Sequence, residues 1–253
     1  MWQYNPFTGK FEKVGLINVA PYCTIEATGW TGSQSGEVLA TGDGTTVDFS
    51  GKVDLPPVNP LNSFTLHYTI GGTAYSVQAD ANGNFSDANV TGSVAQDGTW
   101  NATFNTAPDD ATDITADYSY GIPPANLENA LDPSNPNPSD WGWKTTTGAS
   151  ILGDITITPP VYGFYFFGIR TGSYSNNGAI LQFRLQTVDN TGASVFTAYL
   201  HDNNSFIVER KRNSYGIFLK LDSITPKIQI RLYANAADTY YVRFYDIVLY
   251  RLG

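Results

Sequence analysis

Residues 64–70 read FTLHYTI, with an apolar or aromatic side chain at every second position. Alternation with a period of two is typical of a β-strand that buries one face, here the face that begins with Phe64. The pair Gly71-Gly72 suits a tight turn, and TAYSV at residues 73–77 supplies the returning strand. This stretch therefore predicts an antiparallel β-hairpin inside a β-domain.

Similar alternating runs occur along most of the chain, separated by turns rich in glycine and asparagine. Trp100–Phe104 and Ile114–Tyr120 continue the pattern in the first half, and Ile228–Leu232 and Tyr240–Leu252 continue it in the second. No stretch alternates strands with amphipathic helices, as a parallel sheet would require. The sequence predicts an all-β fold with an N-terminal arm, a small β-sandwich, a Pro-rich linker and a C-terminal jelly-roll β-sandwich.

Composition divides the chain into four segments. Residues 1–34 form the N-terminal arm, which is too short to bury its own aromatic side chains. It therefore either packs on the next domain or docks onto a partner, and we assign it to attachment. Residues 35–120 form the β-sandwich, and residues 121–140 form a Pro/Asn-rich linker of the kind that makes semi-rigid spacers. Residues 141–253 form the jelly-roll domain. The candidate attachment residues of the arm are Trp2, Tyr4, Phe7 and Phe11.

Charged residues are sparse, at 15% of the chain, and the formal net charge is -9 at pH 7. This balance disfavours a nucleic-acid partner, because binding to the phosphate backbone needs clustered Lys and Arg. No run approaches the roughly 18 apolar residues of a membrane span, and Met1–Tyr4 lacks the basic and apolar regions of a signal peptide. We expect no membrane insertion, and synthesis in the cytoplasm without an export signal.

The single cysteine, Cys23, excludes a disulfide within the chain. The fold must therefore be stabilised by the packing of its sheets or by association between copies. We expect a homo-oligomer.

Catalysis needs acids, bases or nucleophiles close together, and the sequence offers few. The only histidines are His67 and His201, and both fall where surface residues are expected. None of the common hydrolase, zinc-protease or phosphate-loop motifs is present. We expect neither enzymatic activity nor catalytic residues, and a carboxylate pair acting on a glycoside stays the alternative.

One loop spaces oxygen donors at alternate positions, which suits calcium. Its candidate ligands are Asp80, Asn82, Asn84 and Asp87. The competing interpretation is a hairpin turn in which Asn82-Gly83 supplies the positive φ, and we favour the turn. No other cofactor is expected.

Aromatic side chains in the second half could form a glycan-binding surface, because flat rings stack on the C–H faces of sugars. The candidate residues are Trp141, Trp143, Tyr174 and Tyr215. Tyrosine and tryptophan are equally common in cores and subunit interfaces, so both of those roles stay open for each residue.

Several turn motifs of the first half occur in a specific order. They read ATGDGTTVDFSG at residues 40–51, GGTAY at 71–75, NGNF at 82–85, TGSV at 91–94, WNATFNTAP at 100–108 and ITADY at 114–118. This order, over about a third of the chain, resembles a β-sandwich module that recurs in structural proteins of tailed-bacteriophage virions. YNPFTGK at residues 4–10 is similar to an N-terminal tag of phage structural proteins. The resemblance implies a virion location and supplies no catalytic residues.

The last strand of the second half, YVRFYDIVLY at residues 241–250, looks like the closing strand of the galactose-binding-like jelly rolls of carbohydrate-binding modules. Such strands often carry an aspartate before the last apolar pair, here Asp246. The resemblance is at the level of the fold and implies glycan binding only by analogy.

Together these features predict a structural component of a tailed-phage virion, either a head fibre or capsid decoration protein or a tail-associated adsorption protein such as a tail fibre. Other virion proteins would be its partners, and its jelly roll would face outward and bind glycans of the host surface. The alternatives are a stand-alone carbohydrate-binding module and, less favoured, a glycan-degrading enzyme.

Overall fold

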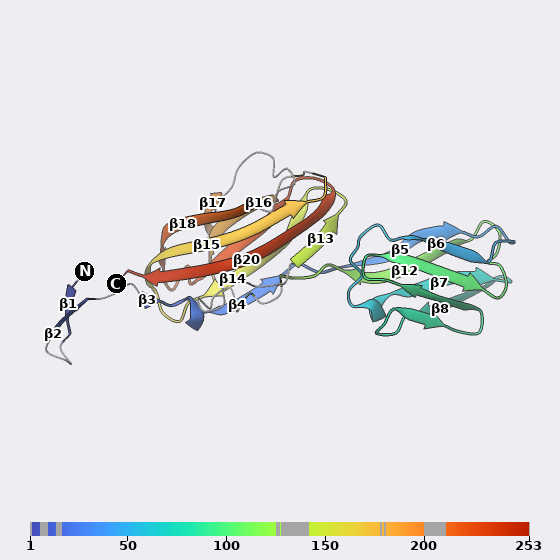
Figure 1. The fold of residues 1–253 in the computed structure, drawn as a ribbon, viewed down its shortest axis with the longest axis horizontal. Coiled ribbons are helices and arrows are strands. Elements are labelled where there is room, and N and C mark those ends of the chain that lie inside the picture. The colour runs from blue at the N-terminus through green and yellow to red at the C-terminus, as the bar shows by residue number, and fades with distance from the viewer. Residues whose placement is uncertain are drawn as a thin grey trace.

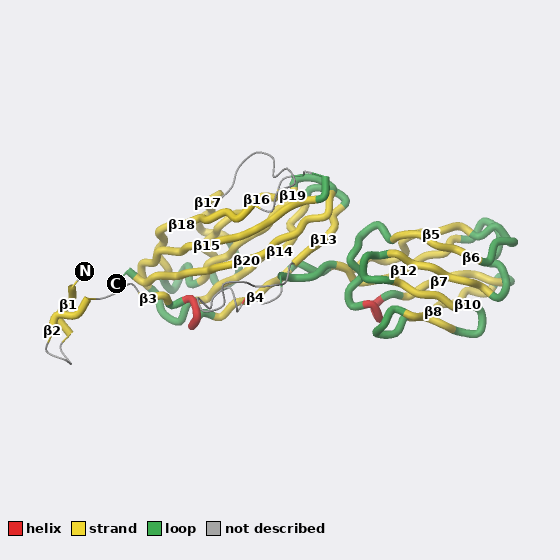
Figure 2. Tube along the Cα trace, viewed as in Figure 1, coloured by secondary structure: helices red, strands yellow, loops and turns green. Residues whose placement is uncertain are grey.

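The computed structural model describes residues 2–5, 10–13, 17–124, 127, 142–177, 179, 181–199 and 211–252, and antiparallel strands are the main secondary structure of this part of the chain. The strands form two β-sandwiches joined end to end, and two short 3-10 helices, η1 (Ala20–Tyr22) and η2 (Leu61–Ser63), interrupt them (Figures 1 and 2). The all-β prediction is confirmed.

The first sandwich pairs two four-stranded sheets, of order β6-β11-β10-β9 and β5-β12-β7-β8. Its strands are β5 (Gly32–Thr41), β6 (Asp48–Lys52), β7 (Thr65–Ile70), β8 (Thr73–Gln78), β9 (Asn84–Ser86), β10 (Val90–Val94), β11 (Thr99–Phe104) and β12 (Asp113–Tyr120). The predicted β7–β8 hairpin is present, with Ile70 opposite Thr73 across the glycine turn. Phe64, Leu66 and Trp100 lie in the buried core between the sheets.

The second sandwich consists of two five-stranded sheets. One has the order β13-β20-β15-β18 with β3 paired to β20, and the other has the order β17-β16-β19-β14-β4. The strands are β3 (Ile17–Asn18), β4 (Thr24–Thr28), β13 (Gly142–Thr146), β14 (Ser150–Thr158), β15 (Gly163–Ser175), β16 (Leu181–Val188), β17 (Ser194–Tyr199), β18 (Lys211–Leu221), β19 (Lys227–Ala234) and β20 (Asp238–Arg251). A separate hairpin joins β1 (Trp2–Asn5) to β2 (Lys10–Lys13).

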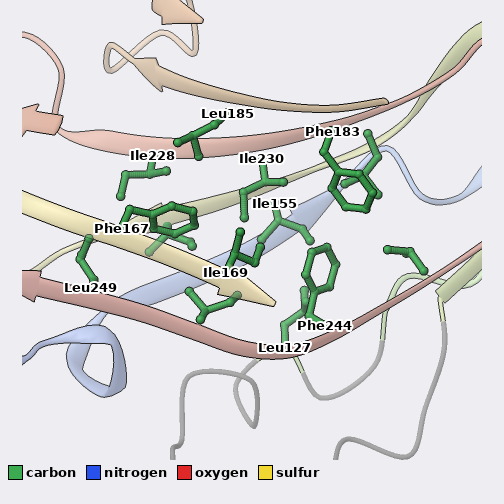
Figure 3. Close-up of a cluster of buried hydrophobic side chains, with 14 of the residues drawn as sticks. Leu127, Ile155, Phe167, Ile169, Phe183, Leu185, Ile228, Ile230, Phe244 and Leu249 are labelled. Carbon is green, nitrogen blue, oxygen red and sulfur yellow. The ribbon is translucent and has the colours of Figure 1, made fainter. Parts of the chain in front are cut away.

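Alternation along each strand explains how this second core forms. Phe167 and Ile169 of β15 face Ile228 and Ile230 of β19 across the space between the sheets (Figure 3). Leu127, which the sequence assigned to the linker, is buried in the same core. The segment predicted to be a linker between two domains therefore contributes at least one side chain to the core of the second sandwich.

The structure differs from the predicted arm of residues 1–34. β4 pairs along its whole length with β14, and β3 pairs with the end of β20. Trp30 is buried in the core of the second sandwich. Residues 17–30 thus belong to the second sandwich, and the first is an insertion between β4 and β13. We call them the inserted sandwich and the split sandwich.

Both ends of the inserted sandwich lie side by side. Gly32 of β5 is opposite Tyr120 of β12, and a Cβ atom on Gly121 would lie 2.1 Å from the carbonyl oxygen of Trp30. The chain then returns through Ile122, whose backbone exchanges two hydrogen bonds of 2.9 Å with Trp143. Two adjacent crossings therefore connect the units.

Candidate functional site

The outer face of the β13-β20-β15-β18 sheet carries large apolar side chains. On β15, Tyr165 and Phe167 point into the core, so the alternate residues Phe164 and Phe166 lie on the opposite, solvent-facing side. Phe164 is 57% exposed and Phe218 of β18 is 71% exposed. Exposed apolar groups gathered in one place are typical of interaction surfaces.

Three of these rings are aligned across neighbouring strands. Phe166 is opposite Phe218 of β18 and Tyr250 of β20, with ring centroids 5.2 Å and 6.5 Å away. The ring of Phe166 lies over Gly216, where an added Cβ would approach it to 2.7 Å. We call Phe164, Phe166, Phe218 and Tyr250 the aromatic platform. Such a surface can bind a sugar ring or an apolar protein face.

The aromatic platform lies at the end of the split sandwich where β3 pairs with the last residues of β20. Tyr250 is opposite Asn18 of β3, and Arg251 is opposite Ile17. The side-chain oxygen of Asn18 also accepts a hydrogen bond of 3.0 Å from the backbone N–H of Leu249. The β1–β2 hairpin extends from this same end (Figure 1).

The predicted glycan-binding residues are only partly brought together. Trp143 is half-buried on the outer face of β13 and stacks on Tyr241 of β20, with centroids 5.6 Å apart and planes at 13°. Tyr174 of β15 is opposite Tyr241 on the other side. Tyr215 instead pairs with Ile169, a core residue, away from this cluster. The side chains of Tyr174 and Tyr215, and all of Trp141, lie outside the described part.

Three of the four predicted attachment residues lie in the strands of the terminal hairpin. Trp2 and Tyr4 belong to β1, and Phe11, opposite Tyr4, belongs to β2. Phe7 lies outside the described residues, as do the side chains of the other three. Their role in attachment stays a prediction.

The loop that was considered as a calcium site is a turn held by hydrogen bonds to its own backbone. The Oδ1 atom of Asp80 accepts the N–H groups of Asn82 at 2.8 Å and Asn84 at 2.9 Å, and Gly83 has a φ of 85°. These bonds lower the pKa of Asp80. Asp87 belongs to the next turn, where its Oδ2 atom accepts the hydroxyl of Tyr68 at 2.7 Å. In the described segments, no three His, Cys, Asp or Glu side chains gather to hold a metal.

A buried lysine contacts both chain segments that connect the two sandwiches. Lys144 of β13 is 8% exposed, and its Nζ donates a hydrogen bond of 2.9 Å to the carbonyl oxygen of Gly29. The same Nζ lies 5.5 Å from the ring centroid of Tyr120, the last residue of the inserted sandwich. Burial lowers the pKa of this ammonium group. One side chain therefore contacts both connections between the sandwiches, at Gly29 on the way into the inserted sandwich and at Tyr120 on the way out.

Sequence reasoning missed the aromatic platform and Tyr241. The run GFYFF at residues 163–167 contained a detectable sign, because it places aromatic residues on both faces of one strand. No sequence pattern indicated that Phe166 lies beside Phe218 and Tyr250, because this contact depends on the order of the strands in the sheet.

No protein-family model and no curated protein matches the chain. Among solved structures, the enzymatically active domain of tailspike protein 4 from bacteriophage CBA120 is 10% identical at a TM-score of 0.29, over 46% of this chain and 16% of that one. A structure of the Gx strain of infectious bursal disease virus is 15% identical at 0.34, over 91% and 73%. The CBM22 tandem of Paenibacillus barcinonensis Xyn10C is 11% identical at 0.23, over 90% and 91%.

At these identities and TM-scores, the three likenesses carry no conclusion about the surfaces or the function of this chain. The chain spans 16% of the length of the tailspike domain it matches. Within the described segments, no helix has the length and apolar character that crossing a membrane requires.

Proposed function

We propose that this chain is a non-enzymatic structural component of a tailed-phage virion, attached through the end that carries the terminal hairpin and the aromatic platform. The resemblance of residues 40–118 to a phage virion module supports the location. Low charge and a scaffold of two β-sandwiches suit an assembly role.

One observation carries the proposal, namely the arrangement of the split sandwich. The chain enters it at Ile17, which pairs with Arg251 at the end of β20, whereas both crossings to the inserted sandwich leave from the other end (Figure 1). An attachment at the first end therefore holds the inserted sandwich away from the particle. Under this proposal the inserted sandwich, and not the jelly roll, is outermost.

The aromatic platform fits the attachment end because it is apolar and continuous with β3. A contact with another virion protein would cover Phe164 and Phe218, whose exposure is otherwise unfavourable. Neither a stand-alone carbohydrate-binding module nor a glycan-degrading enzyme explains why this surface lies beside the terminal hairpin.

Particle incorporation tests the proposal. The wild-type chain should copurify with virions from the phage that encodes it. A variant lacking residues 1–13, and a separate Phe166→Ser/Phe218→Ser variant, should both be depleted from particles. The matched control is Tyr75→Ser, which removes an exposed aromatic ring from the inserted sandwich and should leave incorporation unchanged.

Circular dichroism should show each variant to be folded before particles are compared. A wild-type chain that never copurifies with virions would refute the virion role. Full incorporation of both attachment variants would refute the assigned attachment end. Turnover of a host polysaccharide by the purified chain would favour the enzyme alternative.

A further inference from the structure

The second outer face of the split sandwich, on strands β14, β19 and β16, is polar where the first is aromatic. Two rows of side chains cross these strands in register. One row contains Asp154, Arg231 and Arg184, and the next contains Thr156, Gln229 and Gln186. We call these six residues the polar face. Their strand neighbours Ile155, Ile230 and Leu185 lie in the core, so alternation directs the polar face away from it.

Two amide groups in this face lack part of their hydrogen bonding. Gln186 is 6% exposed and Gln229 is 8% exposed, yet the Oε1 atom of each has no hydrogen-bond partner in the described structure. The Nε2 atom of Gln186 donates to the hydroxyls of Thr197 at 3.0 Å and Ser194 at 3.3 Å. Exchanging the nitrogen and oxygen of an amide would leave its nitrogen unpaired instead.

Burying an unpaired polar atom is costly, so proteins rarely retain two side by side without a use. A ligand hydroxyl can donate to an amide oxygen or accept from an amide nitrogen. Hydroxyl groups therefore satisfy Gln186 and Gln229 in either orientation, which neither a purely anionic nor a purely cationic ligand does.

The charged residues of the face are held in place by other protein groups. Arg231 donates two hydrogen bonds of 2.8 Å to the carboxylate of Asp154, and this pairing raises the pKa of Arg231. The guanidinium of Arg184 lies 4.5 Å from the ring centroid of Tyr233 and donates to the Oε1 atom of Gln182 at 3.1 Å. Asp154 balances the charge of Arg231, so this pair presents no net charge to a ligand.

A cleft of about 470 Å³ continues the polar face at one end. Thr158 and Lys227 line it, and they follow Thr156 and precede Gln229 on the same side of their strands. Its other lining residues are Pro159, Pro160, Val161, Tyr162, Asn190 and Pro226. The volume is within the roughly 300–1,000 Å³ usual for small-ligand sites, and Tyr162, 53% exposed, offers an aromatic ring.

We propose that the polar face and this cleft form one elongated site for a neutral, polyhydroxylated ligand, namely a segment of a glycan chain. One sugar unit would occupy the cleft beside Tyr162, and the next would reach the amides of Gln229 and Gln186. The amide oxygens are covered in the free protein, so side chains of this face must move aside before a ligand can reach them. This site is on the opposite sheet from Trp143.

The purified full chain, displayed multivalently, can be tested on an array of neutral and acidic oligosaccharides, without reference to virions. Neutral oligosaccharides should bind, and Gln186→Leu, Gln229→Leu and Tyr162→Ala should each weaken binding at least about tenfold, the loss expected from removing one well-placed polar or stacking contact. Gln96→Leu, an exposed site on the inserted sandwich, is the matched control, and it and Trp143→Ala should bind as the wild type does.

A second measurement needs no ligand. Because Gln229→Leu removes a buried amide oxygen that has no hydrogen-bond partner, the thermal midpoint of the variant without sugar should equal or exceed that of the wild type. A clearly lower midpoint would mean that the amide is satisfied within the fold, and would overturn the proposal. Absence of binding to neutral glycans, or binding abolished by Trp143→Ala but not by the glutamine variants, would overturn it as well.

Discussion

At the scale of single residues, the inserted sandwich depends on a polar group buried in its core. The hydroxyl of Tyr118 donates to the Oε2 atom of Glu37, which is 7% exposed, and accepts the backbone N–H of Leu55 at 3.1 Å. The Oε1 atom of Glu37 accepts the N–H of Asp54 at 2.8 Å. One tyrosine thus links β12 to β5 and to the segment after β6.

Replacing this hydroxyl should destabilise the chain measurably. Tyr118→Phe leaves a carboxylate oxygen and a backbone N–H unpaired, so the free energy of unfolding should fall by about 1–3 kcal/mol in urea titrations. Tyr75→Phe, on an exposed side chain of the same unit, should change it little. Equal midpoints for Tyr118→Phe and the wild type would contradict the assigned network.

The same tyrosine predicts how stability changes with pH. Burial and the bond to Glu37 raise the pKa of Tyr118 above the ordinary tyrosine value of about 10. Its contribution is therefore complete below pH 10 or so and is lost as the pH rises further. The stability difference between wild type and Tyr118→Phe should narrow in alkaline solution.

At the scale of elements, β4 shows how a short segment can belong to a distant domain. Ile25 and Ala27 pack on the core of the split sandwich, while the alternate residues of β4 face solvent. β4 is also the edge strand of its sheet, and it pairs with β14 from Thr24 to Thr28. Without it, β14 would become the edge strand and part of the core would be exposed to water.

Two truncations separate the hairpin from this strand. Removing residues 1–13 should leave the thermal midpoint nearly unchanged, because the split sandwich begins at β3. Removing residues 1–28 should lower it by several degrees or prevent folding, since β3 and β4 are lost. If both truncations melt like the wild type, β4 does not belong to the split sandwich.

At the scale of the whole molecule, the inserted sandwich has a complete core of its own and both its ends at one place. A Cβ atom on Gly121 would lie 3.3 Å from the Cα of Thr31, so a very short link can replace everything between them. Junctions of this kind are typical of tolerated domain insertions.

Excision should therefore leave two folded pieces. A chain in which residues 32–120 are replaced by a short Gly-Ser link should keep the split sandwich folded, and a fragment of residues 31–121 should fold alone. Each piece should show a single cooperative unfolding transition by calorimetry. Failure of the excised chain to fold would show that the split sandwich requires the insert.

Strands and turns can be predicted from the sequence, because they depend on neighbours a few residues apart. FTLHYTI and the following glycines predicted the β7–β8 hairpin, and the turn at Asp80 was favoured from its Asn-Gly pair alone. The all-β class followed from the same local alternation. Trp143 was also singled out, on composition rather than geometry.

Which strands share a sheet could not be predicted from the sequence and is known only from the three-dimensional fold. Alternation shows that β4 is a strand but not that its partner β14 lies beyond an entire inserted domain, because pairing is set by burial over long separations. The contacts of Trp143 with Tyr241, Phe166 with Phe218, and Gln229 with Gln186 have the same origin. Each of these pairs joins residues on different strands of one sheet. The surfaces that they form therefore depend on the order and register of the strands, which the long-range packing of the cores sets.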